Sequence, residues 1–244
     1  MRVTIITFPG SNCDRDVSVA IKKITGKNPS NIWHQENEVP NCDLIILPGG
    51  FSYGDYLRCG AVAAHSPVMK EVKNHAARGG AVLGICNGFQ ILLEAKLLEG
   101  ALIRNSGLKF VCKQVALKIN KQINSPFLHH FKQNDIIHLP IAHNEGNYFA
   151  DSETLKQIED KGLVALRYHT SSDGNSFNPN GSINNIAAIL SDNGKVLGMM
   201  PHPERYVDNE LGGLDGFEFL KSTLEQLSLA ICAKVFQLLK SQKN

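Results

Sequence analysis

A cysteine stands between two glycines in the stretch Gly84-Ile85-Cys86-Asn87-Gly88, and this spacing could present a nucleophile. A run of strand-forming residues, 81–85, precedes the cysteine, and a helical pattern begins at residue 89. We therefore expect a nucleophile elbow, a sharp strand-to-helix turn, with cysteine in the usual serine position. A helix N-terminus favours the thiolate, which is the reactive form. A glycine-flanked cysteine can also be a packing residue, so other parts of a reaction centre are needed to decide.

A histidine and a carboxylate follow a later predicted strand, in Pro201-His202-Pro203-Glu204. The prolines restrict the backbone, and we expect this segment to be extended rather than helical. Residues two apart in an extended segment project to the same side, so His202 and Glu204 can pair. The carboxylate would then orient the imidazole, whose other nitrogen takes a thiol proton. With Cys86 these residues predict a nucleophilic triad, whereas a lone histidine could simply fill a turn.

Acyl transfer also needs N–H groups that stabilise the developing oxyanion. The amide of Asn87, directly after the predicted nucleophile, is the usual first donor. Gly49 and Gly50 follow another predicted strand, and we assign the second donor to Gly50. The alternative is that these glycines only make a turn.

Short apolar runs that alternate with helical patterns predict an α/β fold, with a mostly parallel sheet covered by helices on both faces. The loops at the carboxyl ends of such strands form the site, so residues 8–14, residues 48–60 and the elbow should meet. Alternation over residues 108–120 predicts added antiparallel strands. The predicted strands are 3–7, 31–34, 43–47, 81–85, 135–141, 163–168, 186–190 and 196–200, and the predicted helices are 14–24, 66–78, 152–160 with Ser152 as N-cap, and 216–239, besides the elbow helix. Residues 171–185 are rich in turn formers, and we expect one domain over residues 1–244.

Charge and cysteine usage exclude several classes of protein. The 25 basic and 23 acidic residues leave a net charge of +2 without a long run of one sign, which argues against a nucleic-acid-binding surface. No apolar run approaches the roughly 18 residues of a membrane span, so we expect a soluble, cytoplasmic protein. The six cysteines form no CxxC pair, which argues against a zinc site or a disulfide framework. We expect no metal site.

The remaining candidate groups favour structural roles. His129, His130 and His138 lack metal-ligand spacing, and we expect these histidines and Cys42, Cys112 and Cys232 to be structural. Cys13 and Arg58 lie in predicted rim loops, where they could serve an interface. The sequence has neither a GxxxxGK[ST] phosphate loop nor a GxGxxG motif after a strand, so we expect no cofactor on this chain.

Taken together, the motifs at 48–50, 84–90 and 201–204 resemble those of the class I (triad) glutamine amidotransferases. Longer blocks resemble one branch of that class, the glutaminase subunits that serve a synthetase of purine biosynthesis. These blocks are FPGSNCD at 8–14, PGGFSYGDYLRCG at 48–60, NPNGS at 178–182 with NIA at 185–187, and GMMPHPER at 198–205. The resemblance therefore covers nearly the whole chain.

The resemblance implies a role for each matching residue. Cys86 would take the acyl group of glutamine as a thioester, with His202 as acid and base and Glu204 as its orienting carboxylate. Gln90, Gly49 and His143 would contact the bound glutamine, although His143 could equally be structural. Asn144 replaces a glycine that is usual in the family loop after His143.

The resemblance also implies partners. Ammonia would pass to a large synthetase subunit, accompanied by a small accessory subunit, and ATP and Mg²⁺ would be used on that partner rather than on this chain. Three other interpretations stay open: a glutaminase for another synthetase, such as anthranilate or guanylate synthesis; a stress-response or peptidase-like protein of the same fold; and a non-catalytic regulatory subunit.

Overall fold

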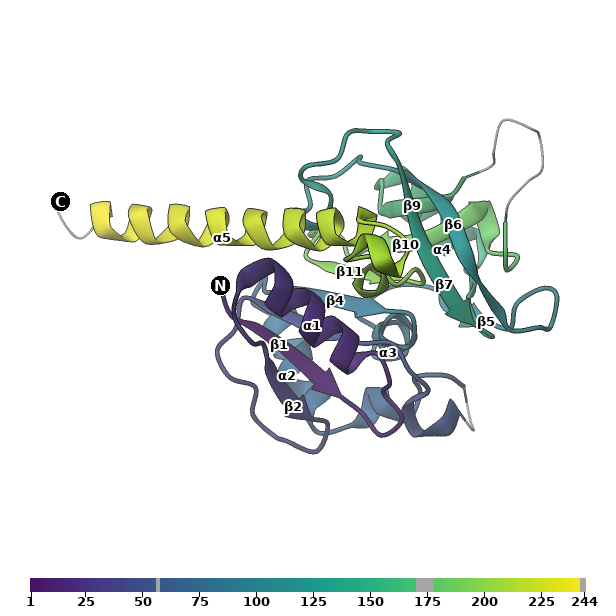
Figure 1. The fold of residues 1–244 in the computed structure, drawn as a ribbon, viewed down its shortest axis with the longest axis horizontal. Helices are drawn as coiled ribbons and strands as arrows, with labels where there is room; N and C mark the ends of the chain where they lie inside the picture. The colour runs from purple at the N-terminus through teal and green to yellow at the C-terminus, as the bar shows by residue number, and fades with distance from the viewer. Residues whose placement is uncertain (56–57, 170–177, 242–244) are drawn as a thin grey trace.

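The computed structural model describes residues 1–55, 58–169 and 178–241, with side chains to residue 233. Its main feature is a nine-stranded sheet in the order β2-β1-β3-β4-β11-β10-β9-β6-β7 (Figure 1). Strands β2 to β11 in this order pair in parallel, and from β11 onward every pairing is antiparallel. The predicted α/β fold with added antiparallel strands is thus confirmed.

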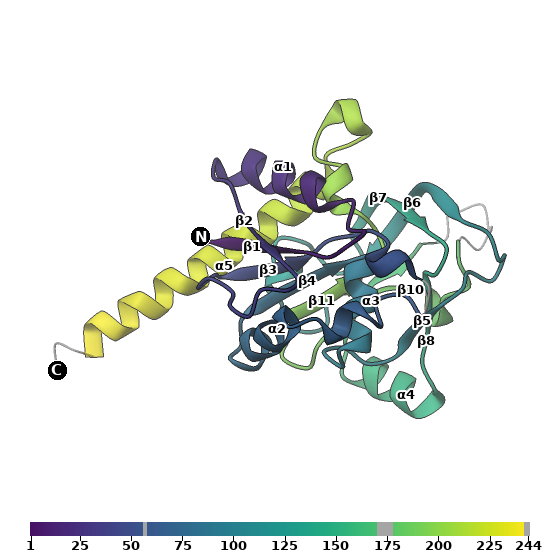
Figure 2. The ribbon, with the colours of Figure 1, turned by 90° about the horizontal axis from the view of Figure 1, so that it is seen from below.

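The parallel half carries the elbow. Its strands are β1 (Val3–Thr7), β2 (Ser30–Trp33), β3 (Leu44–Leu47), β4 (Ala81–Ile85) and β11 (Val196–Met199). Strands β3 and β4 are buried and apolar along their whole length because helices cover both faces. Figure 2 shows α1 (Asp14–Thr25) and α5 (Asp215–Ser241) on one side of the sheet and α2 (Val68–Ala77) and α3 (Asn87–Glu94) on the other.

The antiparallel half consists of β10 (Ile186–Leu190), β9 (Val164–Tyr168), β6 (Val111–Ile119) and β7 (Ile136–His143), with α4 (Ser152–Asp160) beside it. The alternating stretch at 108–120 forms one strand, β6, rather than several. A separate two-stranded sheet, β5 (Ala101–Ile103) with β8 (Asn147–Phe149), was not predicted, because three-residue strands are too short to show a period. Short 3₁₀ helices span Ser52–Asp55, Ala63–His65, Pro126–Leu128, Ile183–Asn185, Pro203–Arg205 (η5) and Asn209–Leu211.

One continuous apolar core joins the two halves. The last helix, α5, packs its first part against α1 and η5, and its C-terminal part projects beyond the body of the molecule (Figure 1). Within the described part of the chain, no helix is long and apolar enough to cross a membrane. The assignment of residues 1–244 to one domain stays a prediction.

The predicted N-cap of α4 is wrong. The N-cap of α4 is Asp151, whose side chain accepts a hydrogen bond of 2.8 Å from the Thr154 amide, and Ser152 is the first helical residue. Of the three cysteines expected to be structural, Cys42 is buried, whereas Cys112 and Cys232 are exposed. Parts of two predicted segments, residues 56–57 of the loop at 48–60 and residues 171–177 of the turn-rich stretch, lie outside the described residues.

Candidate functional site

Cys86 joins β4 to α3 through a strained turn. Its φ of 51° and ψ of −106° lie in a region that residues other than glycine rarely adopt. The flanking glycines allow close packing: a Cβ at Gly84 would lie 2.5 Å from Leu92 Cδ1, and a Cβ at Gly88 would lie 1.9 Å from the Leu47 carbonyl oxygen. The elbow therefore requires glycine on both sides, and its prediction is confirmed.

The sheet register brings the predicted base to the nucleophile. Strand β11 lies parallel to β4 with Met199 opposite Ile85, and the Cys86 amide donates a 2.7 Å hydrogen bond to the Met199 carbonyl. Cys86 follows directly after Ile85, and His202 follows three residues after Met199. The two residues thus sit at the carboxyl ends of neighbouring parallel strands, where α/β sheets place their sites.

His202 and Glu204 form a buried pair. The distance between His202 Nδ1 and Glu204 Oε1 is 2.6 Å, and the two residues are 1% and 2% exposed. The expected extended conformation is wrong, because η5 begins at Pro203. Proline is favoured at the first position of a helix, where its fixed φ suits the turn and its missing N–H costs no hydrogen bond. The turn, not strand alternation, brings the carboxylate to the ring.

The charge state of this pair follows from its neighbours. Burial opposes a charge on His202, but the Glu204 carboxylate and the Cys86 sulfur together raise the pKa of the imidazole well above its usual range. The ring is held by its Nδ1 atom, and the His202 amide donates to the Pro140 carbonyl over 2.9 Å. Two buried atoms, His202 Nε2 and Glu204 Oε2, have no hydrogen-bond partner among the described residues.

The two glycines after β3 differ in their surroundings. Gly50 has a φ of 156° and lies so close to the loop at 10–12 that a Cβ would be 2.6 Å from the Gly10 carbonyl oxygen. Gly50 also lines the pocket at Cys86. Gly49 packs instead against His202, since a Cβ there would lie 2.7 Å from His202 Cε1. The oxyanion role of Gly50 and Asn87 and the glutamine contact of Gly49 stay predictions.

Asn87 holds the elbow to the loop after β3. Its side-chain Oδ1 accepts a 3.0 Å hydrogen bond from the Ser52 amide, and its Nδ2 donates over 2.8 Å to Gln90 Oε1. Gln90 in turn donates through Nε2 to the Glu145 carbonyl, also over 2.8 Å. Both ends of the Gln90 amide are thus engaged within the protein. Its direct contact with glutamine stays a prediction.

A pocket of about 210 Å³ opens at Cys86. This volume is below the roughly 300 Å³ at which sites for drug-sized molecules begin, and it suits a small metabolite. The pocket brings together four predicted site residues, Gly50, Cys86, Gln90 and His143, with Phe51, Asp55, Cys59, Arg104, Ala142, Asn144 and Glu145. Neither Asn87 nor Gly49 is among the residues that line it.

His143 is held on both ring nitrogens. Nδ1 lies 3.1 Å from Asn105 Oδ1 and Nε2 lies 3.5 Å from Asn180 Nδ2. Burial, with repulsion from His202, lowers the pKa of His143 to about 4, so the ring is neutral at neutral pH. These contacts make His143 a support of the loop that follows it. A contact with glutamine stays a prediction.

Three charged residues of the pocket were not predicted: Asp55, Arg104 and Glu145. Arg104 Nε lies 3.8 Å from Glu145 Oε1. Burial raises the pKa of Asp55, and the neighbouring Glu145 adds to this, while hydrogen bonds from Cys59 and Asn87 oppose it. Charged loop residues are common, so the sequence offers no signal that separates these three from solvated ones.

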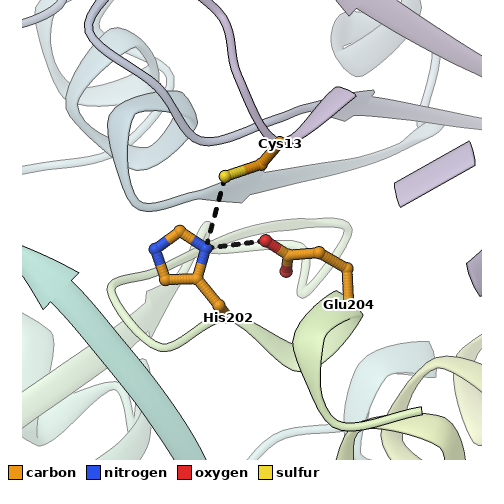
Figure 3. Close-up of side chains that lie close together, drawn as sticks. All are labelled: Cys13, His202 and Glu204. Atoms are coloured by element: carbon orange, nitrogen blue, oxygen red, sulfur yellow. Dashed lines mark hydrogen bonds and ion pairs between the residues drawn. The ribbon is translucent and has the colours of Figure 1, made fainter. Parts of the chain in front are cut away.

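Two further side chains, Cys13 and Arg205, lie against the His202–Glu204 pair, although neither was predicted to be part of this site. Figure 3 shows Cys13. Cys13 is 1% exposed, so its expected place on the rim is wrong. Its Sγ lies 3.9 Å from His202 Nδ1 and accepts a 3.1 Å hydrogen bond from Arg205 Nη2. Arg58, the other predicted rim residue, is exposed and pairs with Glu94.

Comparisons with known proteins agree with this geometry. A sequence model described as a CobB/CobQ-like glutamine amidotransferase domain matches residues 1–212. The chain is 55% identical to phosphoribosylformylglycinamidine synthase subunit PurQ of Zymomonas mobilis over 229 residues, which are 93% of this chain and 100% of the relative. It is 50% identical to the same subunit of Bartonella henselae, over 92% and 98% of the two chains. It is also similar to a chain in the structure of PurLQS from Thermotoga maritima, with a TM-score of 0.80, 43% identity, and coverage of 93% and 98%.

Proposed function

The chain belongs to the CobB/CobQ-like glutamine amidotransferases, among the glutaminase subunits of phosphoribosylformylglycinamidine synthase, and from this premise we propose how it acts. It hydrolyses glutamine to glutamate and ammonia through a thioester on Cys86. The observation that carries this mechanism is the buried pair of His202 and Glu204 beside the thiol at the strained elbow.

The reaction runs in two halves at the Cys86 sulfur. The thiolate attacks the side-chain carboxamide carbon, and the amides of Gly50 and Asn87 stabilise the oxyanion. His202 then gives a proton from Nε2 to the leaving nitrogen, so the C–N bond breaks and ammonia departs. In the second half His202 takes a proton from water, which attacks the thioester and releases glutamate. Glu204 holds Nδ1 throughout, over 2.6 Å.

The charges of the pocket support an α-amino acid as the substrate. Asp55 and Glu145 offer carboxylates to an α-ammonium group, and Arg104 offers a guanidinium to an α-carboxylate. Such a set discriminates free glutamine from a simple amide, because a ligand without both charges leaves these groups unpaired.

Replacing Glu145 with glutamine is expected to raise the KM for glutamine by about 10- to 100-fold, since a hydrogen bond to a charged group contributes about 1.5–3 kcal/mol. Steady-state kinetics of the assembled complex would measure this. Glu153→Gln, an exposed substitution in α4, is the matched control and should leave KM unchanged. An unchanged KM in Glu145→Gln would remove this residue from substrate recognition.

The ammonia passes to a large synthetase subunit that converts formylglycinamide ribonucleotide, with ATP and Mg²⁺, to the formylglycinamidine ribonucleotide, and a small accessory subunit completes the complex. The names of the relatives support this assignment: subunits of phosphoribosylformylglycinamidine synthase, and PurLQS of Thermotoga maritima. The chain itself uses no cofactor and works in the cytoplasm.

The decisive test uses a cell extract that amidates formylglycinamide ribonucleotide, depleted of this chain and then supplied with glutamine or with an ammonium salt. We expect glutamine-dependent synthesis to disappear, ammonium-dependent synthesis to continue, and the purified chain to restore the first. If depletion changes neither activity, the pathway is wrong and the chain serves another synthetase.

A further inference from the structure

Cys13, His202 and Glu204 place a thiol, an imidazole and a carboxylate around one point (Figure 3). One ligand atom of each residue lies within 4.8 Å of the other two, and all three residues are buried. They come from distant parts of the sequence, since Cys13 precedes α1 and the other two follow β11. No metal-ligand spacing in the sequence reveals this set.

The distances suit a divalent transition metal ion. Bonds from zinc to sulfur and to imidazole nitrogen are about 2.3 and 2.1 Å, so an ion would span the 3.9 Å between Cys13 Sγ and His202 Nδ1 at an obtuse angle. The pair of Nδ1 and Oε1, now 2.6 Å apart, would widen as the ion takes the place of their hydrogen bond. Thiolate and imidazole ligands favour zinc and its neighbours over Mg²⁺ or Ca²⁺.

The second carboxylate oxygen of Glu204 is an independent sign of an incomplete site. Oε2 is buried and has no hydrogen-bond partner among the described residues, although buried polar atoms usually have one. It offers a second oxygen to an ion held by the same carboxylate.

A second cavity, separate from the substrate pocket, lies beside Glu204. A cavity of about 560 Å³ is lined by Glu204 and Arg205 together with Arg15, Asp16, Val19, Pro140, Tyr206, Val207 and Leu211. It shares no lining residue with the pocket at Cys86. Cys13 and His202 do not line this cavity and the Glu204 side chain is 0% exposed, so an ion reaches the three ligand atoms only when the residues that cover them move. An ion that enters from this side does not compete with glutamine.

Arg205 limits the affinity of these three residues for a metal ion. Its guanidinium donates a hydrogen bond to Cys13 Sγ over 3.1 Å. The same positive charge repels a cation, so the ion must displace this hydrogen bond to bind. The site therefore suits an ion that binds from solution and leaves again, not a permanently held one.

We propose that Cys13, His202 and Glu204 form an inhibitory site for zinc or a similar divalent transition metal ion. Binding releases two protons to solvent, one from the Cys13 thiol and one from His202 Nδ1, and the sulfur and the freed nitrogen lone pair then bind the ion. The proton of the neutral ring is then confined to Nε2, so the imidazole cannot accept the proton of Cys86. Binding itself is independent of the proposed function, whereas the inhibition rests on it.

The binding test uses Co²⁺ as a spectroscopic probe on the purified full chain and on Cys86→Ala. Both are expected to show a sulfur-to-cobalt charge-transfer band with the visible bands of a tetrahedral ion. Cys13→Ser should lose the charge-transfer band and weaken Co²⁺ binding by at least about 100-fold, more than the loss of an outer partner costs. Cys112→Ser, at an exposed thiol, is the matched control and should keep the band.

The inhibition test measures glutamine-dependent and ammonium-dependent synthesis by the assembled complex as Zn²⁺ is added. Zn²⁺ should lower only the glutamine-dependent rate, without raising KM, and the Cys13→Ser complex should keep the same fraction of its own zinc-free rate when Zn²⁺ is added. A charge-transfer band that persists in Cys13→Ser, or that is missing from the native chain, would overturn the site. Equal zinc sensitivity of native and Cys13→Ser complexes would overturn the inhibition, and a chain without glutaminase activity would still report binding through cobalt.

Discussion

The Cys86→Ala complex is expected to lose glutamine-dependent synthesis by about 10⁴-fold or more, because removing the nucleophile of a catalytic triad leaves only the residual effects of binding and the oxyanion site. Ammonium-dependent synthesis should be unchanged, since free ammonia needs no thioester. The measurement is the rate of formylglycinamidine ribonucleotide formation with each nitrogen source, at equal concentrations of assembled complex.

Two variants serve as controls for this experiment. Cys86→Ser keeps the size of the side chain at the strained elbow, so a loss shared by both variants reflects chemistry and not misfolding. Cys112→Ala removes an exposed thiol and should leave both activities intact. If Cys86→Ala lowered both activities equally, the division of labour between this chain and its partner would be refuted.

The Glu204→Gln variant is expected to lower kcat by about 10³- to 10⁴-fold, as for the loss of the orienting carboxylate in a comparable triad. A glutamine side chain can still face His202 Nδ1, but it carries no charge to stabilise the imidazolium and can present its NH₂ group instead of its oxygen. The rate should fall at all substrate concentrations while KM changes little, because Glu204 does not line the substrate pocket.

The same pair makes stability depend on pH. The folded protein raises the pKa of His202 well above the unfolded value of 6.5, so it binds this proton more tightly than the unfolded chain does. The resulting stabilisation is fully present below about pH 6.5 and is lost as the pH rises through the folded pKa. Denaturant unfolding over this alkaline range should show a declining free energy for the native chain and a weaker decline for Glu204→Gln.

Glu225→Gln is the matched control, because Glu225 also faces a histidine. Glu225 Oε2 lies 3.7 Å from His130 Nδ1, but both side chains are nearly half exposed. Solvent screens such a pair, so its loss should change neither kcat nor the pH dependence of stability. A Glu204→Gln enzyme that kept its kcat would exclude Glu204 from the triad.

Those features that depend on neighbouring residues were predictable from the sequence. The elbow around Cys86 combines a strand, a glycine pair and a helix within fifteen residues, and each leaves a local pattern. The pairing of His202 with Glu204 was also predictable, although the prediction assumed an extended backbone conformation that the structure does not have. Residues two apart can be in contact both in an extended segment and in a 3₁₀ turn. Pro203 favours the turn, because its fixed φ suits the first position of a helix.

Features that depend on tertiary packing were not predictable. Cys13 follows β1 and looks like a loop residue, but the amides of Asn12 and Cys13 donate to the Gly49 carbonyl, and the thiol lies 3.9 Å from His202 Nδ1. The pocket carboxylates Asp55 and Glu145 lie ninety residues apart in sequence and meet only because their loops face the same elbow. No local pattern encodes such an encounter.

The pairing of β11 with β4 has a consequence for how the enzyme is made. The ribosome translates β4 and Cys86 early. Strand β11 and the turn that carries His202 and Glu204 are translated only after the whole antiparallel half. For about half of its synthesis, from residue 86 to residue 204 of 244, the growing chain therefore carries the predicted nucleophile without its predicted base. Under the proposed mechanism, glutamine hydrolysis begins only once translation has passed Glu204, so earlier nascent chains release no ammonia.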